Sequence, residues 1–187
     1  MDVASEKRRL RTEMQACLRA LAPARRALEE ELAQSALQSD AAWRRAGTVL
    51  VHRSVGTEFS VVGATNGAWR EGKRVLFPRV AGDRLVLHEV HAWSELRPGA
   101  FGIPEPAASS REVGPGDVEV ALVPGVAWDA EGGRLGRGGG HYDRLLPRFG
   151  GAVWGVGFDC QVVARVPREP HDAAVQRVLA CKLLGLP

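Results

Sequence analysis

Residues 122–144 read LVPGVAWDAEGGRLGRGGGHYDR, and this stretch decides how the rest of the chain is interpreted. An apolar strand ending at Val123 runs into Pro124-Gly125, and a glycine-rich loop leads to a helical pattern that begins at His141. Each glycine loses more conformational entropy on folding than alanine would, so glycines persist where φ is positive or where the backbone approaches a ligand. The order of strand, glycine loop and helix is typical of an anion-binding site.

Charged side chains flank this loop. Arg134, Arg137 and Arg144 are interleaved with the glycines, and Asp143 follows them at the start of the helix. Backbone N–H groups and guanidinium groups favour an anion, and a carboxylate beside them favours a metal ion. A glycine run by itself is equally consistent with a flexible surface loop. The strand, the helix and the charges around it favour the binding site.

Helical and strand patterns alternate along the chain. Apolar spacing predicts helices over 3–20, 24–38, 40–45, 61–71 and 141–149. Short apolar runs predict strands over 48–52, 74–78, 85–90, 118–123 and 152–158, the second of them stopped by Pro78. Residues 172–184 fit either a strand or a helix, and the proline- and glycine-rich residues 94–117 predict a long, functional connection.

This alternation predicts the α/β class. We expect a three-layer α/β/α arrangement with a mostly parallel central sheet, formed by a single domain over residues 1–187. Ligands of such sheets bind beyond the carboxyl ends of the strands. The candidate loops are those that follow His52, Phe77 and Val123.

Composition narrows the class of protein. The 187 residues are 45% hydrophobic with a net charge of +3, which suits an anionic small molecule as well as a nucleic acid. The sequence has no run of 18 apolar residues, so it predicts no membrane-spanning helix, and the N-terminus lacks the apolar segment of a signal peptide. Three widely spaced cysteines without a CxxC motif indicate a reducing compartment, so we expect a cytoplasmic protein. The sequence does not fix the oligomeric state, which is left open between a monomer and a weak dimer.

Several common motifs are excluded. The glycine loop lacks the Gly-Lys-Ser/Thr of a Walker A loop, and the third glycine of a dinucleotide fingerprint falls on His141. His88 and His91 are three residues apart on a predicted strand, so they do not form the helical pair of a zinc protease. The chain has no nucleophile elbow, and it lacks the aromatic pattern of an RNA-binding protein.

The first predicted helix carries a basic pair. Lys7 and Arg11 are four residues apart and share one face. Taken alone, a basic helix of this kind is most often a solvated surface.

Together these residues resemble the 5-formyltetrahydrofolate cyclo-ligase family, also called 5,10-methenyltetrahydrofolate synthetases. The central signature is Val123-Pro124-Gly125 followed by Arg134 to Arg144, RLGRGGGHYDR. Further matches, in family order, are Lys7 with Arg11, the loop Ser54 to Phe59, Gly102 to Pro106, and Pro167 to Asp172. Departures are His141, Trp128, Gln176 and Ala180.

The resemblance implies an ATP- and Mg²⁺-dependent enzyme that closes 5-formyltetrahydrofolate to 5,10-methenyltetrahydrofolate through a phosphorylated formyl group. It implies that Lys7, Arg134 and Tyr142 are catalytic. The expected ATP-binding residues are Lys7, Arg11, Arg134, Leu135, Gly136, Arg137, Gly138, Gly139, Gly140, His141 and Tyr142. The expected folate-binding residues are Val55, Glu58 and Tyr142, and the expected metal ligands are Asp143 and Asp172.

Two other functions remain open. A paralogue would use the same ATP chemistry on another N-formyl compound, and the loop around Glu58 would distinguish it. A non-catalytic nucleotide- or folate-binding protein of the same fold is the second alternative, suggested by Gln176 and Ala180.

Overall fold

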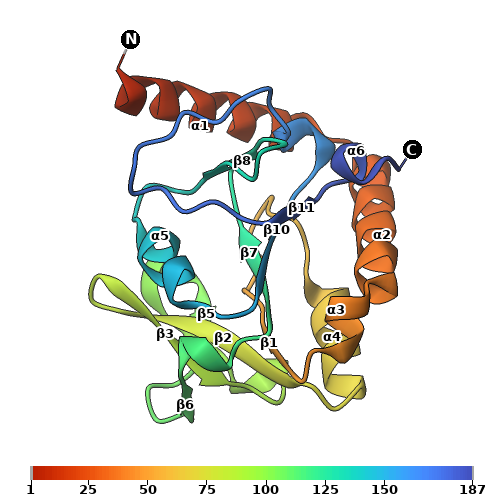
Figure 1. The fold of residues 1–187 in the computed structure, drawn as a ribbon, viewed down its shortest axis with the longest axis vertical. Helices are drawn as coiled ribbons and strands as arrows, with labels where there is room; N and C mark the ends of the chain where they lie inside the picture. The colour runs from red at the N-terminus through yellow and green to blue at the C-terminus, as the bar shows by residue number, and fades with distance from the viewer. Residues whose placement is uncertain (1, 187) are drawn as a thin grey trace.

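The structure is a computed structural model that describes residues 2–186 and is built on one seven-stranded sheet (Figure 1). The strand order is β11-β10-β7-β1-β2-β3-β6. The bounds are β1 Thr48–Leu50, β2 Arg74–Ala81, β3 Arg84–Glu89, β6 Glu112–Val113, β7 Val120–Pro124, β10 Ala152–Val156 and β11 Arg177–Leu179. The strands from β11 to β2 pair in parallel, and β3 and β6 add an antiparallel edge. The predicted α/β class with a mostly parallel sheet is confirmed.

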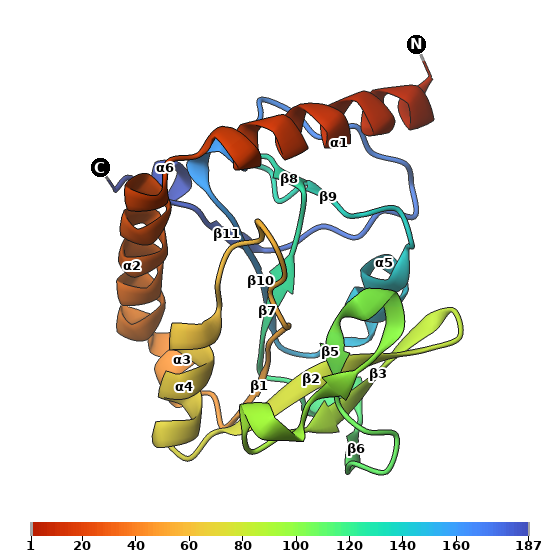
Figure 2. The same ribbon diagram turned by 180° about the vertical axis from the view of Figure 1, so that it is seen from behind.

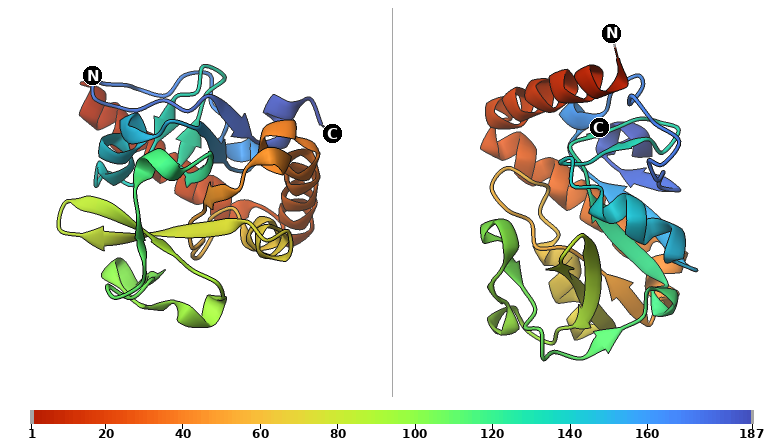
Figure 3. Two further views of the ribbon diagram at one scale, coloured as in Figure 1. Left: turned by 60° about the horizontal axis from the view of Figure 1, so that its bottom comes forward. Right: turned by 90° about the vertical axis from the view of Figure 1, so that its left-hand side faces the viewer.

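Helices cover both faces of this sheet (Figures 1 and 2). Their bounds are α1 Val3–Ala20, α2 Pro23–Ser39, α3 Ala41–Arg45, α4 Val62–Arg70, α5 His141–Leu145 and α6 Cys181–Leu184. Helices α2, α3 and α4 lie on one side and α5 on the other, while α1 crosses the end of the sheet where β7 and β10 finish (Figure 3). Among the described residues, no helix has both the length and the apolar character needed to cross a membrane.

The two faces of β7 explain the layers. Val120 and Leu122 belong to a core cluster that includes Leu37 and Trp43 of the α2–α4 layer. Ala121 and Val123 belong to a second cluster that includes Leu145 and Leu146 beside α5. Successive side chains of a strand point to opposite faces, so a continuous apolar run is required where both faces are covered.

Most predicted boundaries differ from the structure by one or two residues, two differ by more, and the open choice over 172–184 is resolved. Strand β2 continues through Pro78 to Ala81, because its parallel pairing with β1 ends at Leu76 and the missing N–H therefore faces no strand on that side. The helix predicted over 141–149 is α5 followed by a 3₁₀ turn over 146–148. Residues 172–184 contain both candidates in turn, strand β11 and then helix α6.

Two small ribbons complete the fold near the ends of the parallel strands. β4, Arg97–Pro98, pairs with β5, Pro104–Glu105, within the connection expected over 94–117. β8, Ala127–Trp128, pairs with β9, Arg134–Leu135, and leads directly into the glycine loop.

Trp128 fixes the position of the second ribbon on the sheet. Its indole is fully buried, and the backbone of β10 passes it so closely that a Cβ on Gly155 would lie 2.3 Å from an indole carbon. Overpacking of this kind typically costs about 1–3 kcal/mol.

We therefore expect Gly155→Ala to lower the free energy of unfolding by about 1–3 kcal/mol in urea titrations. Gly150→Ala is the matched control, because a Cβ there meets its nearest atom only at 4.0 Å. Equal stability of the two variants would contradict the tight packing of Trp128 against β10.

Candidate active site

A buried carboxylate holds the β8–β9 ribbon to the C-terminal segment. The side chain of Asp129 accepts hydrogen bonds from the backbone N–H groups of Gly133 at 2.7 Å and Val166 at 2.9 Å, and it pairs with Arg168 at 3.0 Å. Burial raises the pKa of Asp129, but these donors outweigh burial and hold that pKa below its ordinary value. The glycine loop and residues 163–172 are thereby held side by side.

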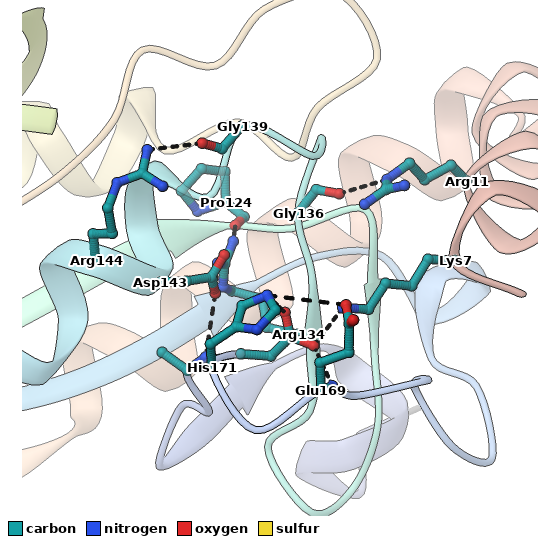
Figure 4. Close-up of polar contacts among 12 residues, drawn as sticks. Lys7, Arg11, Pro124, Arg134, Gly136, Gly139, Asp143, Arg144, Glu169 and His171 are labelled. Carbon is teal, nitrogen blue, oxygen red and sulfur yellow. Dashed lines mark hydrogen bonds and ion pairs between the residues drawn. The ribbon is translucent and has the colours of Figure 1, made fainter. Parts of the chain in front are cut away.

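Helix α1 lies over the glycine loop, where its basic residues can face the loop. The Arg11 Nε atom donates to the Gly136 carbonyl at 2.9 Å (Figure 4). Leu10 and Met14 of the same helix pack against Leu135, whose side chain is buried. Leu135 therefore faces α1, and its role in the site is to anchor the loop.

Lys7 points into the space between α1 and the C-terminal segment. Its Nζ atom lies 2.8 Å from Glu169 Oε2 and 2.5 Å from Asp172 Oδ2. Lys7 is 8% exposed, so this cation is held close to two carboxylates with little water around it. The helix thus brings a buried ammonium group to the same region as the glycine loop (Figure 4).

Arg134 and Asp143 form the second ion pair of the site. Arg134 Nη2 donates to Asp143 Oδ1 at 2.6 Å, and the same oxygen accepts the backbone N–H of Ala173 at 3.2 Å. Ala173 follows Asp172, so the two predicted metal ligands, far apart in sequence, belong to neighbouring segments. The Arg134 guanidinium also lies 5.5 Å from the centre of the Tyr142 ring.

The glycine loop turns through two left-handed residues. Gly138 has φ of 105° and Gly140 has φ of 65°, backbone conformations that residues other than glycine rarely adopt. Gly140 directly precedes α5, and Arg144 of that helix donates back to the Gly139 carbonyl at 2.9 Å. Arg144 also donates to the Asp83 carbonyl between β2 and β3, so it braces the loop rather than facing an anion.

The loop after β1 meets the glycine loop through a third ion pair. Glu58 Oε1 accepts from Arg137 Nη2 at 2.6 Å, and Glu58 Oε2 accepts from the Val55 backbone N–H at 2.9 Å. The predicted folate-binding residues Val55 and Glu58 are therefore placed beside the predicted ATP-binding loop. The pKa of Tyr142 is raised, mainly by burial of its hydroxyl. The charge of Arg134 lowers this pKa, and that of Glu58 raises it.

Some residues around the site were not selected by sequence reasoning. His52 is buried beyond the end of β1, with Nδ1 3.4 Å from the Leu122 carbonyl and Nε2 3.4 Å from Ser54 Oγ. Burial lowers the pKa of His52. Phe101 has φ of 57° and is 81% exposed, and its ring centre lies 6.5 Å from that of His141. A lone histidine and a loop phenylalanine carry no local signal that would have identified them.

The C-terminal segment contains a group of possible metal ligands. One oxygen or nitrogen from each of Glu169, His171 and Asp172 lies within 4.8 Å of the others. Carboxylate oxygens suit Mg²⁺, a hard cation that keeps several waters. Asp143 lies outside this group, although its Oδ1 atom is bonded to Ala173.

The family departures at Gln176 and Ala180 lie directly before and after strand β11, Arg177–Leu179. The backbone N–H of Gln176 donates to the Val153 carbonyl, and its side-chain oxygen accepts the N–H of Val153. Ala180 is fully buried between β11 and α6. Both residues support the β10–β11 edge.

Comparison with known proteins identifies the family. A sequence model of the 5-formyltetrahydrofolate cyclo-ligase family matches residues 3–181. The chain belongs to this family. It is therefore an enzyme of the ligase class, and the resemblance drawn from the sequence is confirmed.

Named relatives agree. The chain is similar to 5-formyltetrahydrofolate cyclo-ligases of Mycolicibacterium smegmatis, with 34% identity over 72% of this chain and 74% of the relative, and Escherichia coli, with 37% identity over 72% and 78%. It is also similar to the solved structure of Aquifex aeolicus 5,10-methenyltetrahydrofolate synthetase. That match has a TM-score of 0.83 and 34% identity, and it covers 93% of this chain and 89% of the other.

The Lys7 ion pairs predict a pH-dependent stability. Burial lowers the pKa of Lys7, yet Asp172 and Glu169 outweigh burial and raise that pKa above 10.5. Burial raises the pKa of Asp172, yet Lys7 outweighs burial and holds that pKa below 3.8. Asp172 therefore stabilises the fold above about pH 4 and loses this effect as the pH falls through its folded-state pKa, whereas Lys7 loses its effect only as the pH rises through its own.

We expect Lys7→Met to lower the free energy of unfolding by about 1–3 kcal/mol at pH 7 in the ligand-free protein. The difference from wild type should shrink below about pH 4, where Asp172 takes up a proton. Arg9→Met, which removes an exposed ion pair with Glu13 on the same helix, should cost less than about 0.5 kcal/mol. A wild-type advantage that persists undiminished at pH 2 would contradict the assignment.

Proposed function

We propose that this chain, as one cyclo-ligase domain, uses ATP to close 5-formyltetrahydrofolate to 5,10-methenyltetrahydrofolate, with release of ADP and phosphate. The observation that carries the proposal is the meeting of three cations beside the glycine loop in a member of this family. Arg11 contacts Gly136, Arg134 contacts Asp143 just after the loop, and Lys7 contacts Asp172 of the neighbouring C-terminal segment. These groups provide the positive charge and free backbone N–H groups that a triphosphate requires.

The chemistry needs no protein nucleophile. The formyl oxygen attacks the γ-phosphorus of ATP, the bond to the β-phosphate oxygen breaks, and ADP leaves. N10 of the folate then attacks the formyl carbon and loses its proton, and the C–O bond breaks to release phosphate. Phosphoryl transfer of this kind depends on charge neutralisation and in-line positioning, which matches a site made of cations and backbone amides.

The cations of the site are paired with carboxylates of the same site. Lys7 contacts Asp172 and Glu169, and Arg134 contacts Asp143. We infer that the ATP phosphates take over Lys7 and Arg11, while Arg134, which is buried, supports the transferred phosphoryl group. Exposed Gly138 and Gly139 offer their N–H groups to the triphosphate.

The donor set fits Mg²⁺. Asp143 and Asp172 would hold the ion, because both are carboxylates on neighbouring segments. The contacts of Asp143 with Arg134 and Ala173 both use its Oδ1 atom, so Oδ2 would be available to the ion. When bound, Mg²⁺ would neutralise phosphate charge. Release of Lys7 from Asp172 would free that carboxylate for the ion.

The folate would lie against the loop after β1. Glu58 can accept paired N–H donors from the amino-pyrimidine edge of the pterin, and its bond to the Val55 N–H orients it. Arg137 would release Glu58 and turn to the phosphates. Half-buried Tyr142 stays protonated because burial raises its pKa, and it would separate the two substrates.

The direct test is the formation of methenyltetrahydrofolate, followed by its absorbance, with 5-formyltetrahydrofolate, ATP and Mg²⁺ and with each omitted in turn. We expect product only when all three are present. ATP-dependent turnover of another N-formyl compound alone would favour the paralogue, and binding without turnover would favour a non-catalytic protein.

Arg134→Gln should lower kcat/KM on the order of 10²-fold or more, because it removes a buried charge that stabilises the transferred phosphoryl group. Arg8→Gln is the matched control, since Arg8 is exposed on α1 and, within residues 2–186, its side chain donates a single hydrogen bond, to Ser5. Near-wild-type turnover by Arg134→Gln, in a folded protein, would contradict the phosphate assignment.

Glu58→Gln should raise KM for the folate roughly tenfold, because one charge-assisted hydrogen bond to the pterin is lost, while ATP binding stays unchanged. The measurement is steady-state kinetics with each substrate varied in turn, together with calorimetric titration of ATP. Loss of ATP binding in this variant would mean that the loop after β1 serves the nucleotide.

A further inference from the structure

A second polar cleft lies beside the proposed active site. It has a volume of about 370 Å³ and lies between β2 and the β4–β5 ribbon, lined by Arg79, Arg97, Gly99, Ala100, Glu105 and Pro106 among others. Arg79 lies on the carboxyl-terminal half of β2, beyond the part that pairs with β1. The cleft is therefore at the same edge of the sheet as the loop after β1 and the glycine loop.

Glu105 is the unusual group in this cleft. The residue is 7% exposed, but its carboxylate oxygens are not among the buried side-chain atoms that lack a partner, which in residues 2–186 are Trp128 Nε1 and Arg134 Nε. The Glu105 carboxylate therefore reaches the cleft without a protein donor, and it can accept hydrogen bonds from a ligand with N–H groups. The chain makes room for it, because a Cβ on Gly99 would lie 2.6 Å from Glu105 Oε2.

Two arginines complete the cleft. Within the described part of the chain Arg79 forms no ion pair, and Arg97 donates only to the carbonyls of Ser94 and Leu96. Two guanidinium groups with no carboxylate partner favour carboxylates of a ligand, since each can bind one through two parallel hydrogen bonds. The cleft thus matches a ligand that carries both an amide N–H and carboxylates.

The cleft is adjacent to the proposed folate site. Ala100 lines it, and the next residue, Phe101, reaches back toward His141 at the end of the glycine loop. A substrate with its pterin at Glu58 would pass Phe101 and present its other end to the cleft.

We propose that this cleft binds the glutamate end of the folate, with Glu105 accepting the amide N–H and Arg79 and Arg97 binding the two carboxylates. This inference rests on the proposed function and assigns a second contact region of the same substrate. It also gives a role to Glu105, the acidic residue of the Gly102 to Pro106 motif, which the phosphate chemistry does not use.

The test compares 5-formyltetrahydrofolate with 5-formyltetrahydropteroate, which ends in a carboxylate and lacks the glutamate. We expect the double variant Arg79→Gln/Arg97→Gln to lower kcat/KM about tenfold or more on the folate and to leave it unchanged on the pteroate. Glu105→Gln keeps the shape of the side chain and should show the same dependence on substrate, with a smaller effect. Arg84→Gln, an exposed arginine on β3 that does not line the cleft, should affect neither substrate.

The outcomes separate this inference from the function on which it rests. Equal losses on both substrates, or no loss on either, would overturn the cleft assignment while leaving the cyclo-ligase activity in place. If the wild-type protein closes neither compound in the presence of ATP and Mg²⁺, the proposed function fails and the cleft loses its ligand. Thermal melting of each variant checks that Glu105→Gln and the arginine variants are folded.

Discussion

The buried carboxylate of Asp129 is the interaction on which the site depends. It binds the backbone of its own ribbon, the N–H of Val166 and the guanidinium of Arg168. A buried carboxylate is tolerated here because hydrogen-bond donors and a guanidinium group surround its oxygens. The result is that the segment carrying Glu169 and Asp172 is fixed beside the strand that feeds the glycine loop. Both cations of the site contact that segment: Lys7 pairs with Glu169 and Asp172, and Asp143, the partner of Arg134, accepts the N–H of Ala173.

The charged groups of the site neutralise one another. Lys7, Arg134 and Arg137 are each held by carboxylates that are themselves expected to bind metal or folate. This arrangement limits the cost of keeping cations partly out of water, and it orients each group before the substrates arrive. In the proposed function, ATP and Mg²⁺ would bind by exchanging these partners. Phosphate would replace the carboxylates on the cations, and the metal ion would replace the cations on the carboxylates. The Arg137–Glu58 pair joins the two substrate regions directly.

In the proposed mode of binding, the carboxyl edge of the sheet would distribute the substrate over separate loops. The glycine loop after β7 would supply backbone N–H groups, the loop after β1 would supply Glu58, and the extension of β2 would supply Arg79. Parallel strands end at one edge, so residues that are far apart in the sequence can face the same ligand. Pro78 marks where β2 leaves its parallel neighbour and becomes free to border the cleft. The β4–β5 ribbon then closes the far side.

The sequence by itself determined the α/β class, the strand before the glycine loop, the helix bearing Lys7 and Arg11, and the family. The class and these elements follow from apolar periodicity and from the run of glycines, and the family follows from the resemblance of the motifs around residues 123–125 and 134–144. Only the tertiary structure decided which charges meet. The pairing of Lys7 with Asp172 spans 165 residues, and no local pattern specifies it. Equally, only the packing of β5 against β2 places Glu105 in a cleft together with Arg79 and Arg97. Burial and contact are properties of packed segments, which periodicity along one segment does not contain.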